Sequence, residues 1–149
     1  GLIPIAQAAV ESGADWLGVV AAEEALALRA MGLGVPILVL GLVPADQWLD
    51  LADRQIRITV AHLDQVTALA PYRGPRLSIH LKVETGLGRL GFPPDDLPFI
   101  VSRLDELLAV HIEGVSSHLA SLEEQDLEYT GRQLSRFTRS VSWAIGSRA

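Results

Sequence analysis

Short apolar runs alternate with segments of helical periodicity along the whole chain, and this alternation restricts the possible folds more than any other feature. The apolar runs cover residues 16–20, 37–40, 58–60, 77–83 and 110–116. Apolar residues at helical spacing, with glycine, proline or acidic residues at the segment ends, predict helices over residues 2–10, 22–31, 44–54, 63–69, 95–108 and 125–145. Because no hairpin dipeptide interrupts this order, we expect right-handed βαβ units and a parallel sheet.

The fourth predicted strand distinguishes between the two architectures that this pattern allows, a doubly wound sheet and a (β/α)8 barrel. Its alternation places apolar side chains on one face and polar ones on the other. The polar set is Ser78, His80, Lys82 and Glu84. A doubly wound sheet has helices over both faces and leaves little room for such a row, whereas a barrel lumen accommodates it if each group is paired. The prediction is an α/β fold, a partial (β/α)8 TIM barrel with about five βα units and parallel strands.

Composition excludes several classes of protein. The 149 residues are 49% apolar and 20% charged, which is too apolar for a disordered segment, and the length suits one domain. A net charge of −6 without a basic cluster argues against nucleic acid and anionic membranes as partners. The longest apolar stretch, residues 35–43, is far shorter than the roughly 20 residues of a membrane span, and no signal-peptide pattern opens the chain. We therefore expect a soluble cytoplasmic protein. The absence of cysteine excludes disulfides and thiolate metal sites.

A glycine-rich segment follows the fourth predicted strand and carries a single arginine, Arg89. Residues 86–91, Gly-Leu-Gly-Arg-Leu-Gly, match the dinucleotide-binding pattern G-x-G-x-x-G. That pattern needs a helix that opens inside the glycines, and here Phe92-Pro93-Pro94 follows, which biases the backbone away from helix. We therefore do not expect a dinucleotide site. A βα loop with glycines at tight turns explains the glycines but leaves Arg89 without a role.

Residues 80–92, His-Leu-Lys-Val-Glu-Thr-Gly-Leu-Gly-Arg-Leu-Gly-Phe, resemble the signature in the barrel domain of alanine racemase, a pyridoxal-phosphate enzyme of fold type III. Residues 14–29 and 36–41 resemble the second barrel strand, its helix and the third strand. Residues 114–120 resemble the sixth strand with its histidine, and residues 129–137 resemble the helix after it. The resemblance covers nearly all of the chain and implies the middle portion of the N-terminal barrel domain.

Three residues receive roles from this resemblance. Arg89 matches the arginine that hydrogen-bonds the phenolic oxygen of pyridoxal 5'-phosphate and lies beside the substrate carboxylate, and a planar, permanently charged guanidinium suits both anions. His118 matches the histidine whose ring packs on the pyridine ring of the cofactor. Lys82, the only lysine in the chain, matches a lysine that is carbamylated in many members and orients the arginine. A carbamate pairs with the Arg89 guanidinium, whereas an ammonium there is disfavoured. The alternative is an unmodified Lys82 paired with Glu84 or another acid.

Other polar residues receive plainer interpretations. Glu84 stands where the family usually has the shorter aspartate, so the hydrogen bonding around it is expected to differ. His80 is expected to support the polar network of the lumen face, and Tyr129 matches no catalytic position. No spacing of histidines and carboxylates predicts a metal site.

The resemblance implies that the intact protein racemises a small amino acid, L-alanine to D-alanine, with pyridoxal 5'-phosphate and as a homodimer. The family's cofactor-bearing lysine lies at the end of the first barrel strand, and its acid/base tyrosine comes from the second subunit; neither matches a residue of this chain. We therefore expect residues 1–149 to be an incomplete barrel domain, without the first strand, the last strands and the C-terminal β-domain, and inactive alone. The alternatives are a serine or broad-spectrum racemase, a D-amino-acid aldolase or dehydratase, and a non-catalytic pyridoxal-phosphate-binding domain.

Overall fold

In the computed structural model, which describes residues 1–120 and 127–146, five strands form one parallel sheet whose order follows the sequence. The strands are β1 (Leu17–Val19), β2 (Ile37–Val39), β3 (Ile56–Val60), β4 (Leu77–Lys82) and β5 (Val110–Ser116). Each strand pairs in parallel with the next one along the chain. The predicted parallel sheet of βαβ units is therefore confirmed.

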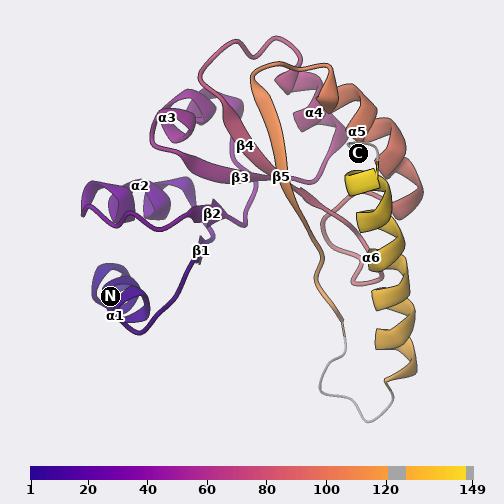
Figure 1. Cartoon of the computed structure of the whole chain (residues 1–149), viewed down its shortest axis with the longest axis horizontal. Coiled ribbons are helices and arrows are strands. Elements are labelled where there is room, and N and C mark those ends of the chain that lie inside the picture. Colours follow the sequence, from indigo (N-terminus) through magenta and orange to yellow (C-terminus); the bar gives the residue numbers. More distant parts are fainter. Residues whose placement is uncertain (121–126, 147–149) are drawn as a thin grey trace.

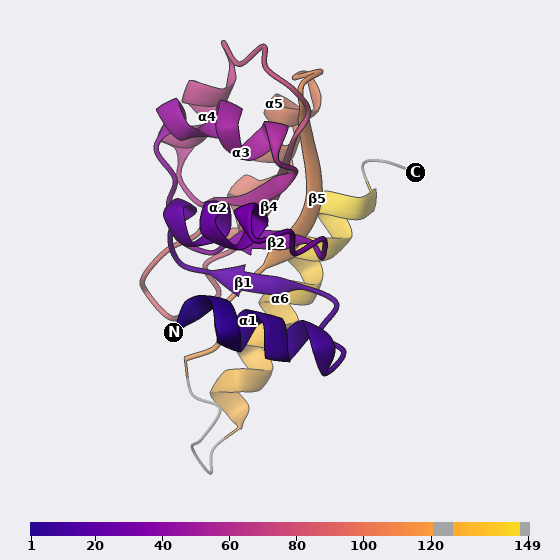
Figure 2. The same cartoon turned by 90° about the vertical axis from the view of Figure 1, so that its left-hand side faces the viewer.

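The helices cover one side of this sheet. They are α1 (Leu2–Glu11), α2 (Ala22–Ala30), α3 (Trp48–Asp53), α4 (Leu63–Leu69), α5 (Leu97–Asp105) and α6 (Glu128–Gly146), and short 3-10 turns, η1 (Ala45–Gln47) and η2 (Pro94–Asp96), precede α3 and α5. Figure 1 shows the strands as an arc with the helices along its outer side, and Figure 2 views this arc from the side of α1 and α2. A doubly wound sheet reverses its strand order and has helices on both faces. The observed arrangement is that of a partial (β/α)8 barrel.

The hydrophobic core lies between the outer face of the sheet and these helices. Strand side chains such as Ile58, Ile79 and Leu81 are fully buried there against helix residues that include Leu28 and Leu104. Along β4 the burial alternates strictly, with apolar residues buried and polar residues half-buried. The predicted division of this strand into an apolar face and a polar lumen face is confirmed.

Several element boundaries differ from those predicted. β3 begins at Ile56, two residues before the predicted start, because the polar Arg57 faces the lumen and interrupts the apolar run without ending the strand. The helix predicted to reach residue 108 ends at Asp105, where the Leu107 N–H donates to the Leu104 carbonyl and closes a turn. α6 is described from Glu128, and residues 125 and 126 of its predicted start lie outside the described residues. Within the described ranges, no helix is long and apolar enough to cross a bilayer.

Candidate active site

Lys82, Arg89 and His118, the three site residues predicted from the sequence, line one cavity of about 470 Å³. Lys82 ends β4, Arg89 lies in the loop that follows, and His118 lies two residues beyond the end of β5. The other lining residues are Val20, Leu40, Gly41, Thr59, Ala61, Leu90, Ser116 and Ser117. The cavity therefore lies at the carboxyl ends of the strands, where the loops of (β/α)8 enzymes form their sites, and its volume falls within the roughly 300–1,000 Å³ of small-molecule pockets.

Arg89 and His118 approach each other across this cavity. Arg89 Nη2 lies 3.4 Å from His118 Nδ1. A guanidinium has donors but no acceptor, so Nδ1 accepts this contact and the proton of a neutral imidazole lies on Nε2. Both side chains are exposed. The site thus presents a permanent cation beside a flat ring at an open mouth.

Lys82 lies half-buried behind Arg89. Burial and the nearby Arg89 charge lower the pKa of the Lys82 amine, and the Glu84 carboxylate opposes that shift. Among the ion pairs found in residues 1–120 and 127–146, none includes Lys82. The geometry therefore favours a neutral amine at this position more than bulk water does.

Glu84 is engaged by the backbone of its own loop rather than by Lys82. Its carboxylate accepts the Gly86 N–H and, at 3.0 Å, the Arg89 N–H. Burial acts to raise the pKa of Glu84, but hydrogen bonds from the backbone of Arg89, Gly88, Gly86 and Leu87 outweigh it and lower the pKa. The Glu84 carboxylate therefore fixes the glycine loop around an anion.

The base of this loop is closed by backbone pairing. Glu84 N–H donates to the Phe92 carbonyl at 2.9 Å, and Phe92 N–H donates to the Lys82 carbonyl at 2.8 Å. A Cβ on Gly91 would lie 2.6 Å from the Glu84 nitrogen, so this close approach admits only glycine. The loop that presents Arg89 therefore leaves the sheet and returns to it at adjacent points.

Ser117, which follows β5, and two residues of α6 also hold the loop. Thr85 and Ser117 share a hydrogen bond between their hydroxyls at 2.7 Å. Tyr129 donates its hydroxyl proton to the Gly86 carbonyl at 2.5 Å, and Arg136 donates to the Thr85 carbonyl at 3.1 Å. Sequence reasoning missed the contribution of Tyr129. Its only available signal was the spacing of polar residues along one face of the predicted last helix.

A second polar cluster lies on the lumen face. Arg57 forms a two-pronged ion pair with Glu113, at 2.8 and 3.1 Å, and its guanidinium stacks 5.2 Å from the ring of Trp16. His80, expected to support the polar network of the lumen, lies 3.8 Å from the Glu113 carboxylate and 5.7 Å from the Trp16 ring. Burial is the main cause that lowers the pKa of His80.

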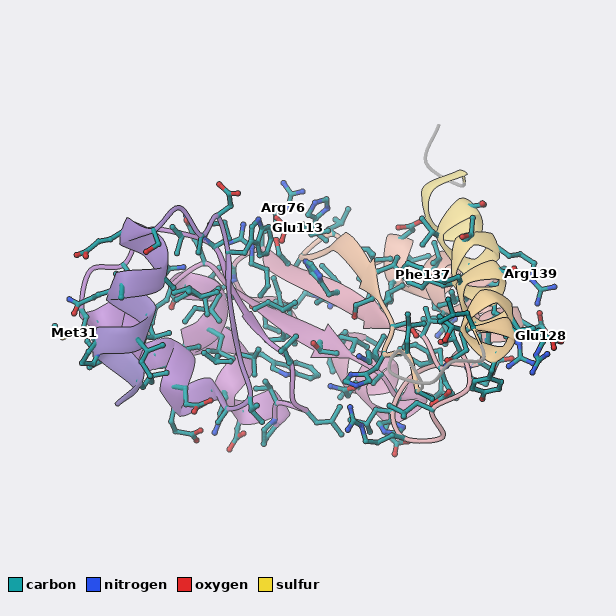
Figure 3. All side chains as sticks on the ribbon, turned by 90° about the horizontal axis from the view of Figure 1, so that it is seen from below. Met31, Arg76, Glu113, Glu128, Phe137 and Arg139 are labelled. Carbon is teal, nitrogen blue, oxygen red and sulfur yellow. The ribbon has the colours of Figure 1, made fainter. Side chains whose placement is uncertain are left out.

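The amino ends of the strands form a separate cavity of about 350 Å³ that Arg57, Arg76 and Glu113 help to line. Figure 3 shows Arg76 and Glu113 together at one end of the sheet, away from Glu128 and Arg139 on α6. A register shift in the β4–β5 pairing after Ile79 leaves Glu113 as an extra residue and directs it toward Arg57. Ion pairs at this end of a barrel serve its stability rather than its chemistry.

In the described part of the chain, no group of three histidine, cysteine or acidic residues could hold a metal ion.

Comparison with known proteins gives a consistent family. A family model described as "Alanine racemase, N-terminal domain" matches residues 1–147. Alanine racemase from Desulforamulus reducens is 40% identical over 141 residues, covering 92% of this chain and 38% of that protein. Alanine racemase from Symbiobacterium thermophilum is 39% identical over 146 residues, covering 95% and 38%.

Solved structures of racemases superpose closely on this fold. Alanine racemase from Clostridium difficile 630 gives a TM-score of 0.89 at 26% identity, over 99% of this chain and 40% of that one. Histidine racemase from Leuconostoc mesenteroides gives a TM-score of 0.85 at 28% identity, over 94% and 39%. The chain spans 38% of the length of the first two curated relatives.

Proposed function

Because this chain belongs to the alanine racemase family, through that family's N-terminal domain, we propose that the intact protein is a pyridoxal-phosphate-dependent amino-acid racemase that interconverts L- and D-alanine. A fold hosts many chemistries, so the site has to carry the proposal. The observation that carries it is that Lys82, Arg89 and His118 line the same cavity. We propose further that residues 1–149 are part of a barrel whose remaining strands, together with a C-terminal β-domain, belong to the rest of the protein.

The residues that line the cavity fit a flat, anionic ring such as that of pyridoxal 5'-phosphate. Arg89 offers a planar set of donors for an oxyanion, and His118 offers a ring that can pack on another ring. Leu40 and Leu90 supply an apolar wall beside them. Arg89 would hold the phenolic oxygen and His118 the pyridine ring. When bound, this cofactor supplies an electron-withdrawing system that makes the α-proton of an amino acid removable.

The chain's own residues orient and neutralise charge in this scheme. The planar guanidinium of Arg89 offers paired donors, so it can hold a substrate carboxylate beside the cofactor. The contact between Arg89 and His118 Nδ1, at 3.4 Å, orients the imidazole ring beside the guanidinium. Inversion of the α-carbon needs two acid/base groups on opposite faces. We assign these to a lysine on the first barrel strand and to a tyrosine of a second subunit, which makes the active protein a homodimer.

Lys82, converted to a carbamate, would carry a negative charge that orients Arg89. Its neutral amine would attack the carbon of CO2, form an N–C bond and release one proton, which leaves a carbamate. Burial and the Arg89 charge, which lower the pKa of Lys82, favour the neutral amine that this reaction needs. Growth of a carbamate ¹³C signal with labelled bicarbonate, absent in Lys82→Ala, supports this role. An unmodified Lys82 amine in bicarbonate at neutral pH overturns it.

The test of the proposed function uses the full-length protein. Arg89→Gln removes the charged donor. Because hydrogen bonds to charged groups are strong, we expect kcat/KM for alanine racemisation to fall by about 10- to 100-fold. Arg73→Gln is the control, because Arg73 is an exposed arginine whose hydrogen bonds within the described part of the chain go to backbone carbonyls near α4. Polarimetry measures racemisation, and the absorbance of the bound cofactor measures its affinity. Failure of the wild-type protein to bind pyridoxal 5'-phosphate or to racemise alanine refutes the proposal.

A substrate panel separates the alternatives. Preference for serine or histidine over alanine replaces the proposed substrate, and the structural likeness to a histidine racemase makes histidine a necessary member of the panel. A requirement for a divalent metal points to an aldolase or dehydratase. Cofactor binding without turnover of any member points to a non-catalytic domain.

A further inference from the structure

We propose that α6 positions Arg89, and that Tyr129 is the positioning residue, because this helix holds the backbone of the loop that presents the guanidinium. The inference rests on the proposed function only for the role of Arg89 itself. The Tyr129 hydroxyl donates to the Gly86 carbonyl at 2.5 Å, three residues before Arg89. Arg136 donates to the adjacent Thr85 carbonyl at 3.1 Å. Two consecutive carbonyls of the loop are thus held from one helix.

The contacts come from a single face of α6. Tyr129, Gln133 and Arg136 are spaced four and three residues apart, which places them in line along the helix. Gln133 is fully buried, and its side-chain oxygen accepts the Ala120 N–H at 3.1 Å. Ala120 lies two residues after His118. The same helix face therefore contacts both the loop that carries Arg89 and the segment that carries His118.

The loop and the helix fit each other too closely for this contact to be incidental. A Cβ on Gly86 would collide with the Tyr129 hydroxyl oxygen, and it would lie 3.3 Å from Gln133 Nε2. Gly86 also has a φ of 139°, which other residues rarely adopt. Only glycine at residue 86 therefore lets the Tyr129 hydroxyl reach the Gly86 carbonyl.

The loop needs a hydrogen bond from α6 because glycines on either side of the turn before Arg89 leave its backbone free to move. Gly86 and Gly88, with φ values of 139° and 74°, flank the turn that leads to the exposed Arg89 side chain. Glu84 draws the loop N–H groups inward. Tyr129 fixes the carbonyl that points outward. Without the Tyr129 hydrogen bond, the Gly86–Arg89 segment can pivot about the Glu84 carboxylate, and the Arg89–His118 separation is no longer set.

The test compares two hydroxyl deletions on α6 in the full-length protein. Tyr129→Phe keeps the ring and removes the bond to Gly86. Ser135→Ala is the matched control, because within the described residues the exposed Ser135 hydroxyl bonds the Gly131 carbonyl of its own helix and no part of the loop. We expect Tyr129→Phe, and not Ser135→Ala, to raise the rate of trypsin cleavage after Arg89 relative to cleavage after Arg73. We also expect it to weaken pyridoxal 5'-phosphate binding by about 2- to 10-fold, the equivalent of one neutral hydrogen bond.

A double-mutant cycle separates positioning from general stability. In an Arg89→Gln background, Tyr129→Phe should weaken cofactor binding no further, because it acts through the arginine. Cleavage that rises equally after Arg89 and Arg73, unchanged cleavage, or additive losses in the cycle overturn the inference. The proteolysis readout needs neither cofactor nor turnover. A wild-type protein that does not bind pyridoxal 5'-phosphate therefore refutes the proposed function, while the ratio of cleavage rates still decides whether Tyr129 holds the loop.

Discussion

Replacement of Gly114 by alanine tests the packing of the lumen face directly. A Cβ at residue 114 would lie 2.6 Å from His80 Cε1 and 2.7 Å from Nδ1. Gly114 does not have a positive φ, so alanine fits its backbone conformation and the added methyl group meets only crowding. The imidazole has to retreat by roughly 0.8 Å to restore ordinary contact. Trp16 on one side and Glu113 on the other restrict that retreat.

Overpacking of this kind costs about 1–3 kcal/mol of the free energy of unfolding. With a urea dependence of about 2 kcal/mol per molar, a cost of about 2 kcal/mol lowers the unfolding midpoint by roughly 1 M. The assay is urea unfolding of the full-length protein, followed by circular dichroism and by tryptophan fluorescence. Gly131→Ala is the control, because nothing lies within 4 Å of a Cβ there. In a helix interior that change is expected to stabilise by about 0.5–1 kcal/mol.

The partner of the clash is identified by a second substitution. His80→Ala removes the ring, so Gly114→Ala in that background should cost at least about 1 kcal/mol less than it does alone. Equal costs in the two backgrounds, or a single variant that unfolds at the wild-type midpoint, would refute the packing argument.

Three further predictions concern the charged groups. Glu84→Gln is expected to lower the free energy of unfolding by about 1.5 kcal/mol at pH 7, since it removes hydrogen bonds to a charged group. The folded state lowers the pKa of Glu84, so this difference should be present above the ordinary glutamate pKa of about 4.3 and should shrink as the pH falls below it, as urea unfolding at pH 7 and pH 3 can show. Glu113→Ala should cost about 1 kcal/mol because it unpairs Arg57 at a partly solvated site, and a double-mutant cycle with Arg57→Ala should recover a coupling of similar size. Burial lowers the pKa of His80, so the unfolded chain takes up the proton first, and stability should fall as the pH drops below about 6.5 in the wild type but not in His80→Gln.

The sequence allowed the fold to be predicted because its signals are local. The alternation of apolar runs with helical periodicity specifies βαβ units, and the polar row of β4 selects the barrel over the doubly wound sheet. β3 was predicted two residues short because the run of apolar residues breaks at Arg57. Arg57 lies within β3 and pairs with Glu113 of β5, and these two strands are not neighbours in the sheet.

The site could be predicted in part for the same reason. Lys82 and Arg89 lie in one continuous motif, so a pattern in the sequence brings them together, and the structure places both beside His118 around one cavity. The register shift that directs Glu113 into the lumen depends on the pairing of β4 with β5, which neither strand encodes alone. The contact between Tyr129 and Gly86 spans 43 residues and depends on how α6 packs against the sheet. The spacing of polar residues along α6 marks a polar helix face but does not indicate which loop that face contacts.

The strand order of the sheet has a consequence for how the polypeptide is made. Each strand from β2 to β5 pairs with the strand synthesised just before it, so none of these strands has to wait for a distant partner. A growing chain can therefore dock each βα unit on the preceding one as it leaves the ribosome, with the newest strand as the open edge. The hold of α6 on the Arg89 loop is an exception, because the loop emerges about forty residues before the helix that fixes it. During synthesis the sheet can be complete through β5 while the guanidinium still lacks its final position.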